Sequence, residues 1–333
     1  MKGLHFLVAT VPAVAIAFFG ACRPAYASSL TIDGTFSSSI TSLSDAAAIE
    51  VAIDAAISVI EGDITSPNNI TVAIDFTNMS SGLGENNSGA VTVSYFEYYN
   101  ALKAVATSPD LLTALASLGA APVNNSSPNP VNGSDEVELT TAEARNLGFG
   151  GAPQISGTGG PFDAVVELNT SITSPPNGLS GFYSLESAAM HELDETLGIG
   201  GDGSTLANSG GAIGDLDLYR YSAPGVRSYT TSASAVSYFS IDGGNTVLSY
   251  FNQVAGADYA DWSSDPIPPG FGVQVQDAFS EPGTNPTLGT NELIAFQSIG
   301  YQVTTAPEPS TLLLSGSVLA IVAGVRKRRL NGK

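Results

Sequence analysis

Residues 184–198 constrain the fold of this chain more than any other segment. Ser184 is a suitable N-cap, because its hydroxyl can accept a hydrogen bond from a free backbone N–H of a first helical turn. Apolar residues at a spacing of four predict one buried face: Leu185, Ala189, Leu193 and Leu197. Gly198 is a residue at which such a helix can end. The segment therefore predicts a helix over 184–197 that packs against a core.

A second face of this helix carries ionisable side chains. His191, Asp194 and Glu195 lie at i, i+3 and i+4, and the other histidine of the chain, His5, lies near the N-terminus. Two side chains at i and i+4 can bind one metal ion, and zinc accepts carboxylate oxygen as well as imidazole nitrogen. Glu192 can then take a proton from a metal-bound water. We predict His191 and Glu195 as metal ligands and Glu192 as the catalytic base.

The N-terminus has the features of a secretory signal peptide over residues 1–27. Lys2 supplies the positive start, an apolar run extends from residue 7 to 19, and Ala25-Tyr26-Ala27 is a small-x-small cleavage pattern. The sequence therefore predicts export, with a mature chain that begins near Ser28. Lipid attachment at Cys22 is a minor alternative.

The C-terminus, residues 306–333, carries a second signal. Pro307, Glu308 and Pro309 precede an apolar stretch of about 15 residues (311–325) and a basic cluster at 326–329. The stretch is shorter than the roughly 20 residues of an untilted membrane span. This tail resembles the PEP-CTERM sorting signal of Gram-negative bacteria. The resemblance implies processing by an exosortase-type enzyme and transfer to the cell surface or an exopolysaccharide matrix, after transient anchoring in the inner membrane. An ordinary single-pass anchor is the alternative.

The charge of the chain limits its partners. The net charge is −20, and the basic residues between 28 and 305 are only Lys103, Arg145, Arg220 and Arg227, which leaves that region with about −26. Such a region repels nucleic acid, so no nucleic-acid partner is expected. The chain has one cysteine, and it precedes the predicted cleavage site, so the mature domain contains no disulfide.

Several other elements follow from apolar periodicity. Helical spacing predicts helices over 45–60 and 291–299, and alternation predicts strands over 70–76 and 163–169. The strand at 163–169 shortly precedes the motif helix. In zincin metallopeptidases a strand in this place borders the cleft and can pair with an extended peptide.

The helix and its flanking segments resemble the zincin metalloproteases, and more closely a PEP-CTERM-tailed metalloprotease family. The similar segments are HELDETLGIGG (191–201), DLDLYRYSAPGVRS (215–228), YFSIDGGNT (238–246), DYADW (258–262) and NELIAFQSIGY (291–301). Glu195 stands where the usual His-Glu-x-x-His pattern has its second histidine. The resemblance implies an α+β, zincin-like fold over 28–305. It has a twisted mixed sheet and an active-site helix in the N-terminal part, 28–200, and a C-terminal lobe over 201–305.

The resemblance also implies a secreted zinc metallopeptidase that hydrolyses peptide bonds of a peptide or protein substrate. The carboxylate-rich site admits Mn²⁺ or Ca²⁺ as alternative ions. The alternative function is a non-catalytic surface or matrix protein on the same fold.

The third metal ligand is open in the sequence. In the metzincin pattern a ligand follows Gly198 at the position that Gly201 occupies here, and Asp202 comes next. A shift of one residue is easy for a glycine-rich backbone. We predict Asp202 as the third ligand, with Asp215 and Asp217 as further candidates.

Two smaller groups of residues have alternative roles. Tyr219 or Tyr221 could donate a hydrogen bond to an oxyanion, although a core or surface aromatic role is favoured. Asp258 and Asp261 could bind Ca²⁺, although a structural turn is favoured.

Overall fold

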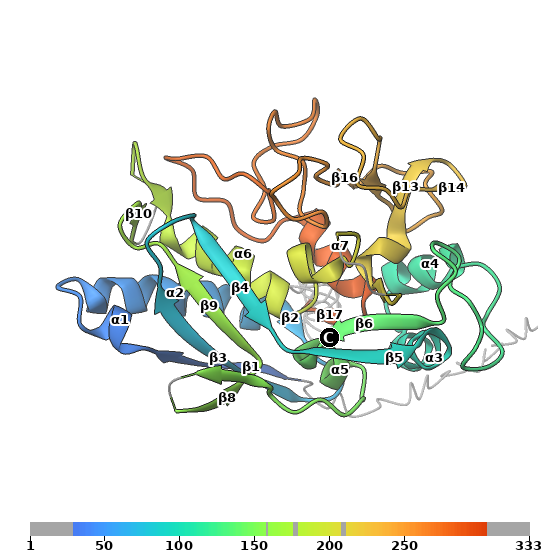
Figure 1. Cartoon of the computed structure of the whole chain (residues 1–333), viewed down its shortest axis with the longest axis horizontal. Helices are drawn as coiled ribbons and strands as arrows, with labels where there is room; N and C mark the ends of the chain where they lie inside the picture. Colours follow the sequence, from blue (N-terminus) through green and yellow to red (C-terminus); the bar gives the residue numbers. More distant parts are fainter. Residues whose placement is uncertain (1–28, 158, 176–178, 208–210, 305–333) are drawn as a thin grey trace, which may run out of the picture.

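The computed structural model describes residues 29–304, apart from residue 158 and the segments 176–178 and 208–210 (Figure 1). The predicted signal peptide, residues 1–27, and the predicted sorting signal, residues 306–333, lie outside the described residues. Within the described part of the chain, no helix is long and apolar enough to cross a membrane.

A mixed four-stranded sheet is the centre of the fold. Its strands, in order across the sheet, are β1 (Leu30–Phe36), β3 (Ile70–Asn78), β9 (Ala164–Leu168) and β4 (Gly84–Ser88). β1, β3 and β9 run parallel, and β4 pairs antiparallel with β9. Ile70, Val72, Ile74 and Phe76 alternate on the buried side of β3, as the pattern predicts.

The strand predicted over 163–169 forms, but it is not the edge of the sheet. β9 lies between β3 and β4, and β4 is the edge strand that lies beside helix α6 (Leu185–Thr196). The prediction that 163–169 borders the cleft for edge pairing was therefore wrong. β4 has no apolar alternation because an edge strand has little side-chain burial to encode, and its sequence is Gly-Glu-Asn-Asn-Ser.

Two helices cover one face of this sheet and pack against each other, α2 (Ala46–Asp63) and α6. Both confirm their predictions. Ser184 caps α6 by accepting a hydrogen bond from the backbone N–H of Ser187. Gly198 follows the helix with φ of 104°, a conformation that favours glycine. The apolar face of α6 is fully buried, which fixes the orientation of the helix. The opposite face of α6 is therefore held toward the C-terminal segments.

A second group of elements adjoins the central sheet. It contains α3 (Tyr95–Val105), α4 (Pro109–Ser117), α5 (Thr141–Asn146) and the three-stranded sheet β12 (Ile213–Gly214), β6 (Glu136–Thr140) and β5 (Ala90–Ser94). The remaining short elements before α6 are α1 (Ser38–Thr41), β2 (Ile64–Thr65), β7 (Ile155–Gly157), β8 (Gly160–Phe162), β10 (Thr173–Ser174) and β11 (Tyr183–Ser184).

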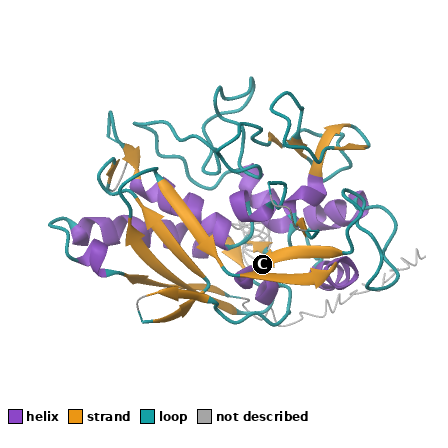
Figure 2. Cartoon of the chain, viewed as in Figure 1, coloured by secondary structure: helices purple, strands orange, loops and turns teal. Residues whose placement is uncertain are grey.

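The C-terminal part is mostly loops, and it lies over α6 (Figure 2). Its elements are η1 (Gly200–Gly203), η2 (Leu216–Tyr219), β13 (Arg220–Ala223), β14 (Val226–Arg227), β15 (Tyr238–Phe239), β16 (Ser249–Tyr250), α7 (Thr290–Ser298) and β17 (Gln302–Val303). β17 pairs with β2, which returns the chain to the N-terminal part. Buried residues before and after residue 200 belong to one apolar cluster, for example Leu193, Phe239 and Phe296. The mixture of helices and sheets confirms the α+β class.

Candidate metal site

Helix α6 brings two of the predicted ligands together. His191 and Glu195 are one turn apart, and His191 Nε2 lies 3.5 Å from Glu195 Oε1. The buried apolar face of α6 fixes the position of this turn. The two side chains therefore converge without any rearrangement of the backbone. Glu195 Oε1 also accepts a hydrogen bond of 3.0 Å from the backbone N–H of Gly201, which orients the carboxylate.

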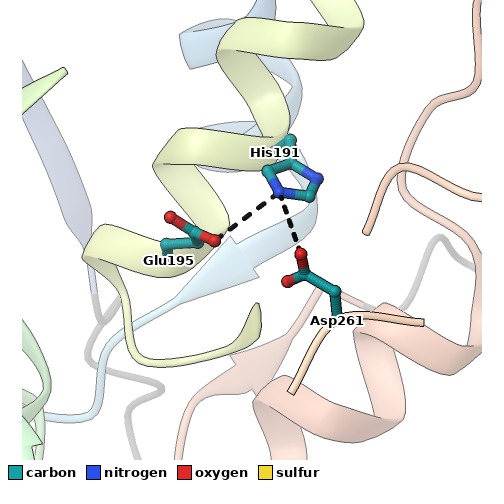
Figure 3. A group of neighbouring side chains, drawn as sticks. All are labelled: His191, Glu195 and Asp261. Carbon is teal, nitrogen blue, oxygen red and sulfur yellow. Dashed lines mark ion pairs between the residues drawn. The ribbon is translucent and has the colours of Figure 1, made fainter. Parts of the chain in front are cut away.

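The third member of the group is Asp261. Its Oδ2 lies 3.7 Å from His191 Nε2, and one ligand atom from each of His191, Glu195 and Asp261 lies within 4.8 Å of the others (Figure 3). Asp261 comes from the segment before Trp262, whose buried indole anchors it. The sequence favoured a structural turn for Asp261, and the structure instead directs its carboxylate at His191. The group could bind a metal ion.

A hydrogen bond fixes the imidazole of His191 in the orientation that a metal ligand requires. Its Nδ1 lies 2.9 Å from the carbonyl oxygen of Val275, so the Nδ1–H donates there and Nε2 faces the two carboxylates. Metal-ligating histidines commonly hold their second nitrogen in this way. Ligand atoms about 2.0–2.2 Å from a tetrahedral ion stand roughly 3.3–3.6 Å apart. The spacing of 3.5 Å lies within this range, and the spacing of 3.7 Å lies just above it.

The electrostatics of the group call for a cation. Burial lowers the pKa of His191, but Asp261 and then Glu195 raise it, and the net effect lies well above the usual range. Burial raises the pKa of Asp261 well above its usual range, although His191 opposes this. A proton or a metal ion between the side chains relieves the repulsion between the two carboxylates.

Glu192 lies beside this group and against the edge strand. It is 6% exposed, and burial together with the charge of Glu195 raises the pKa of its carboxyl well above the usual range. The Asn86 side chain donates to the Glu192 backbone carbonyl at 2.7 Å and to Thr196 Oγ1 at 2.8 Å, which ties β4 to α6. The carboxyl lies directly against Gly84, where a Cβ would overlap Glu192 Oε1.

For the metallopeptidase that the sequence predicts, the Gly84→Ala variant is expected to lose most peptide hydrolysis while it retains bound metal. The new methyl group takes the place of the Glu192 carboxyl, whose Cδ would lie 2.8 Å from it, and the three atoms nearest to it all belong to Glu192. Steady-state hydrolysis and the metal content of the purified protein test this. Gly62→Ala is the matched control, because a Cβ there meets nothing within 4 Å. An unchanged rate in Gly84→Ala would show that Glu192 does not need its position against β4.

Asp202 lies in the same cleft but outside the group of three. It lies in the 3₁₀ turn η1 and is not among the side chains that converge on His191, and burial, followed by the charge of Glu195, raises its pKa to about 8. Asp258 lies on the other side of Gly201, whose Cβ would be 3.1 Å from Asp258 Cγ. The structure therefore brings Asp261, and not Asp202, to His191 and Glu195.

The other acidic candidates do not join the site. Asp194 is fully buried, and burial followed by the charge of Glu292 raises its pKa. Asp217 forms a buried ion pair with Arg220 at 3.0 Å. Asp215 is buried in the core, with its Oδ1 accepting from the N–H of Leu216 at 2.7 Å.

The two tyrosine candidates also lie elsewhere. Tyr219 donates to the carbonyl oxygen of Ser298 at 3.1 Å, and Tyr221 stacks on Tyr238. Both are buried, which agrees with the core role that the sequence favoured. Tyr183 and Tyr259 are the tyrosines that line the cleft.

The cleft around the site has a volume of about 970 Å³. Its walls come from β4, from α6, and from the C-terminal segments around residues 201–204, 256–261 and 277–280. Gln276 was not predicted. Its side-chain amide donates to Asp261 Oδ1 at 3.1 Å and lies 3.3 Å from His191 Nε2. A lone glutamine in a loop carries no sequence signal for such a contact.

No family model, curated protein or solved structure matches the chain.

Proposed function

We propose that the protein is a zincin-like zinc metallopeptidase in which His191, Glu195 and Asp261 hold the metal and Glu192 is the general base. The observation that carries the proposal is the convergence of these four side chains in one large cleft. One imidazole nitrogen and two carboxylate oxygens are donors that zinc accepts. Their two negative charges also balance the charge of a divalent cation, and Mn²⁺ or Ca²⁺ are alternative ions for so carboxylate-rich a set.

The arrangement of the sheet supports a zincin-like fold. β4 is antiparallel to three parallel strands and lies at the edge beside α6. Among the described strands, none pairs with its outer edge. An extended peptide could add there as a further strand and present its backbone along the cleft.

The residues around the metal position have distinct chemical tasks. A metal ion held there would polarise a peptide carbonyl and acidify a water molecule. Glu192 takes a proton from the attacking water onto its carboxylate and can pass it to the leaving amine nitrogen. The Nδ1–H bond to Val275 keeps the imidazole of His191 in one tautomer. The buried setting of Glu192 raises the pKa of its carboxyl, because desolvation opposes the ionised form.

A non-catalytic protein on the same fold is the second candidate, and one contact favours it. The amide of Gln276 already donates to Asp261 Oδ1 and lies beside His191 Nε2. In a protein without metal this amide would link the two side chains directly. Such a protein would act as a surface or matrix component.

For the location of the protein we propose export, processing of residues 306–333 by an exosortase-type enzyme, and release to the cell surface or an exopolysaccharide matrix. The support is the Pro307-Glu308-Pro309 motif with its apolar stretch and basic end. The substrate would then be a peptide or protein outside the cell.

Metal analysis of the full-length protein tests the proposed ligands. We expect about one zinc per chain in the wild type. Asp261→Asn should bind zinc at least about a hundredfold more weakly, because it loses one of the three protein ligands. Asp202→Asn is the matched control, since its carboxylate lies outside the group, and it should bind as the wild type does. Absence of metal from the wild type would favour the non-catalytic candidate. Weak binding in Asp202→Asn alone would make Asp202 the third ligand.

A further inference from the structure

The cleft carries more negative charge than the proposed reaction uses. Seven carboxyl side chains line it: Glu85, Glu192, Glu195, Asp202, Asp258, Asp261 and Asp277. Three of them have a role in the proposed reaction. Glu195 and Asp261 hold the metal with His191, and Glu192 accepts the proton. The other four have no role in that chemistry.

Apart from His191 beside Glu195 and Asp261, no basic side chain of the described residues lies in the cleft to neutralise this charge. Lys and Arg are absent from the lining of the cleft. Arg145 pairs with Asp163 at 2.8 Å, and Arg220 pairs with Asp217 at 3.0 Å. Arg227 donates to the carbonyl oxygen of Ser117 at 2.7 Å, and Lys103 is exposed on α3. The lysine and arginine side chains of the described residues therefore leave the four remaining carboxyls of the cleft open to a cation from a ligand.

Asp277 gives this charge a specific position. It is 2% exposed and lines the cleft. Its Oδ2 accepts from the backbone N–H of Gln274 at 2.8 Å, but its Oδ1 has no hydrogen-bond partner. A buried carboxylate oxygen without a donor is costly, and a donor from a ligand would remove that cost.

The residues after Asp277 suit a long side chain with an apolar stem. Ala278 and Phe279 line the same cleft, and Phe279 is 38% exposed. Lysine and arginine side chains pack their methylene groups on such surface and place the charged end in a polar setting. Asp258 is exposed at another part of the lining and adds to the attraction without a direct contact.

We propose that the cleft selects peptide segments that carry an arginine or lysine side chain, with Asp277 as the residue that receives the cationic group. Cleavage of such a peptide rests on the proposed function. Binding of the peptide can be measured without cleavage. Glu192→Gln therefore serves as the background in which binding is measured.

The test compares two fluorescent peptides that differ only in arginine or its neutral isostere citrulline. Titration of full-length Glu192→Gln protein should show at least about tenfold tighter binding of the arginine peptide, because a charge-assisted hydrogen bond is lost with citrulline. Adding Asp277→Asn should bring the ratio close to one. Asp54→Asn, an exposed residue of α2 outside the cleft, is the matched control for net charge and should keep the ratio.

Equal affinity for the two peptides overturns the inference whether or not Asp277→Asn folds. A ratio that survives in a folded Asp277→Asn variant overturns the assignment to Asp277. Hydrolysis by the wild type without preference for arginine would leave the proposed function standing and the inference wrong. Preferential binding of the arginine peptide without hydrolysis would support the inference and contradict the proposed function.

Discussion

Replacement of Glu192 by glutamine is expected to lower the rate of peptide hydrolysis by roughly 10²–10⁴-fold while the protein keeps its metal. The amide cannot accept the proton of the attacking water, and Glu192 is not one of the three converging ligands. The measurements are kcat with casein or a peptide, and metal content per chain.

The matched control for this experiment is Glu186→Gln. Glu186 lies in the first turn of the same helix and outside the cleft, so its loss should change neither rate nor metal content. A full rate in Glu192→Gln would remove Glu192 from the mechanism. Loss of metal in that variant would instead make Glu192 part of the metal site.

Glu143→Gln is expected to stabilise the fold above neutral pH. Glu143 and Asp215 are each 1% exposed, and no described lysine or arginine forms an ion pair with either. Burial, followed by the charge of Asp215, raises the pKa of Glu143 well above its usual range, and burial raises the pKa of Asp215 to about 8. In the folded state these carboxyls therefore hold protons that the unfolded chain has already released.

The sign of the pH dependence follows from this difference. Between the unfolded pKa, about 4, and the raised folded pKa, the native state binds more protons, so the free energy of unfolding falls as pH rises. Each pKa unit corresponds to about 1.4 kcal/mol. Glutamine at position 143 removes one of the two ionisations, so the gain of the variant over the wild type should be small near pH 5 and grow as the pH rises toward 8.

Urea unfolding of wild type and Glu143→Gln across pH 5–8 measures the difference directly. Glu136→Gln is the matched control, because Glu136 is exposed at the start of β6. Parallel pH profiles for wild type and Glu143→Gln would show that the buried pair does not set the pH dependence.

The local features of α6 were predictable because they depend on neighbours in sequence. The Ser184 cap, the buried stripe and the glycine after the helix act within a few residues, and the convergence of His191 with Glu195 follows from the pitch of one helix. The same holds for the strand at 70–76, whose apolar residues alternate on its buried side.

The third member of the group around His191 was not predictable in this way. Asp202 is close to Glu195 in sequence and lines the same cleft, but it is not among the side chains that converge on His191. Asp261 reaches His191 because the next residue, Trp262, is buried against Phe239 and Phe251. The indole N–H of Trp262 also donates a hydrogen bond of 3.0 Å to the Glu292 carboxylate. That placement depends on contacts between distant segments, which no local pattern encodes.

The metal position also has a mechanical consequence. The chain has one cysteine, so no disulfide within the chain can join its segments. His191 and Glu195 belong to α6 and Asp261 to the loops above it, about 70 residues further on. A bound ion would close that loop as a covalent cross-link does, and closure of a loop of this length corresponds to roughly 4 kcal/mol of unfolded-state entropy. The C-terminal part has little regular structure, so one bound ion would act as a reversible cross-link between its loops and α6.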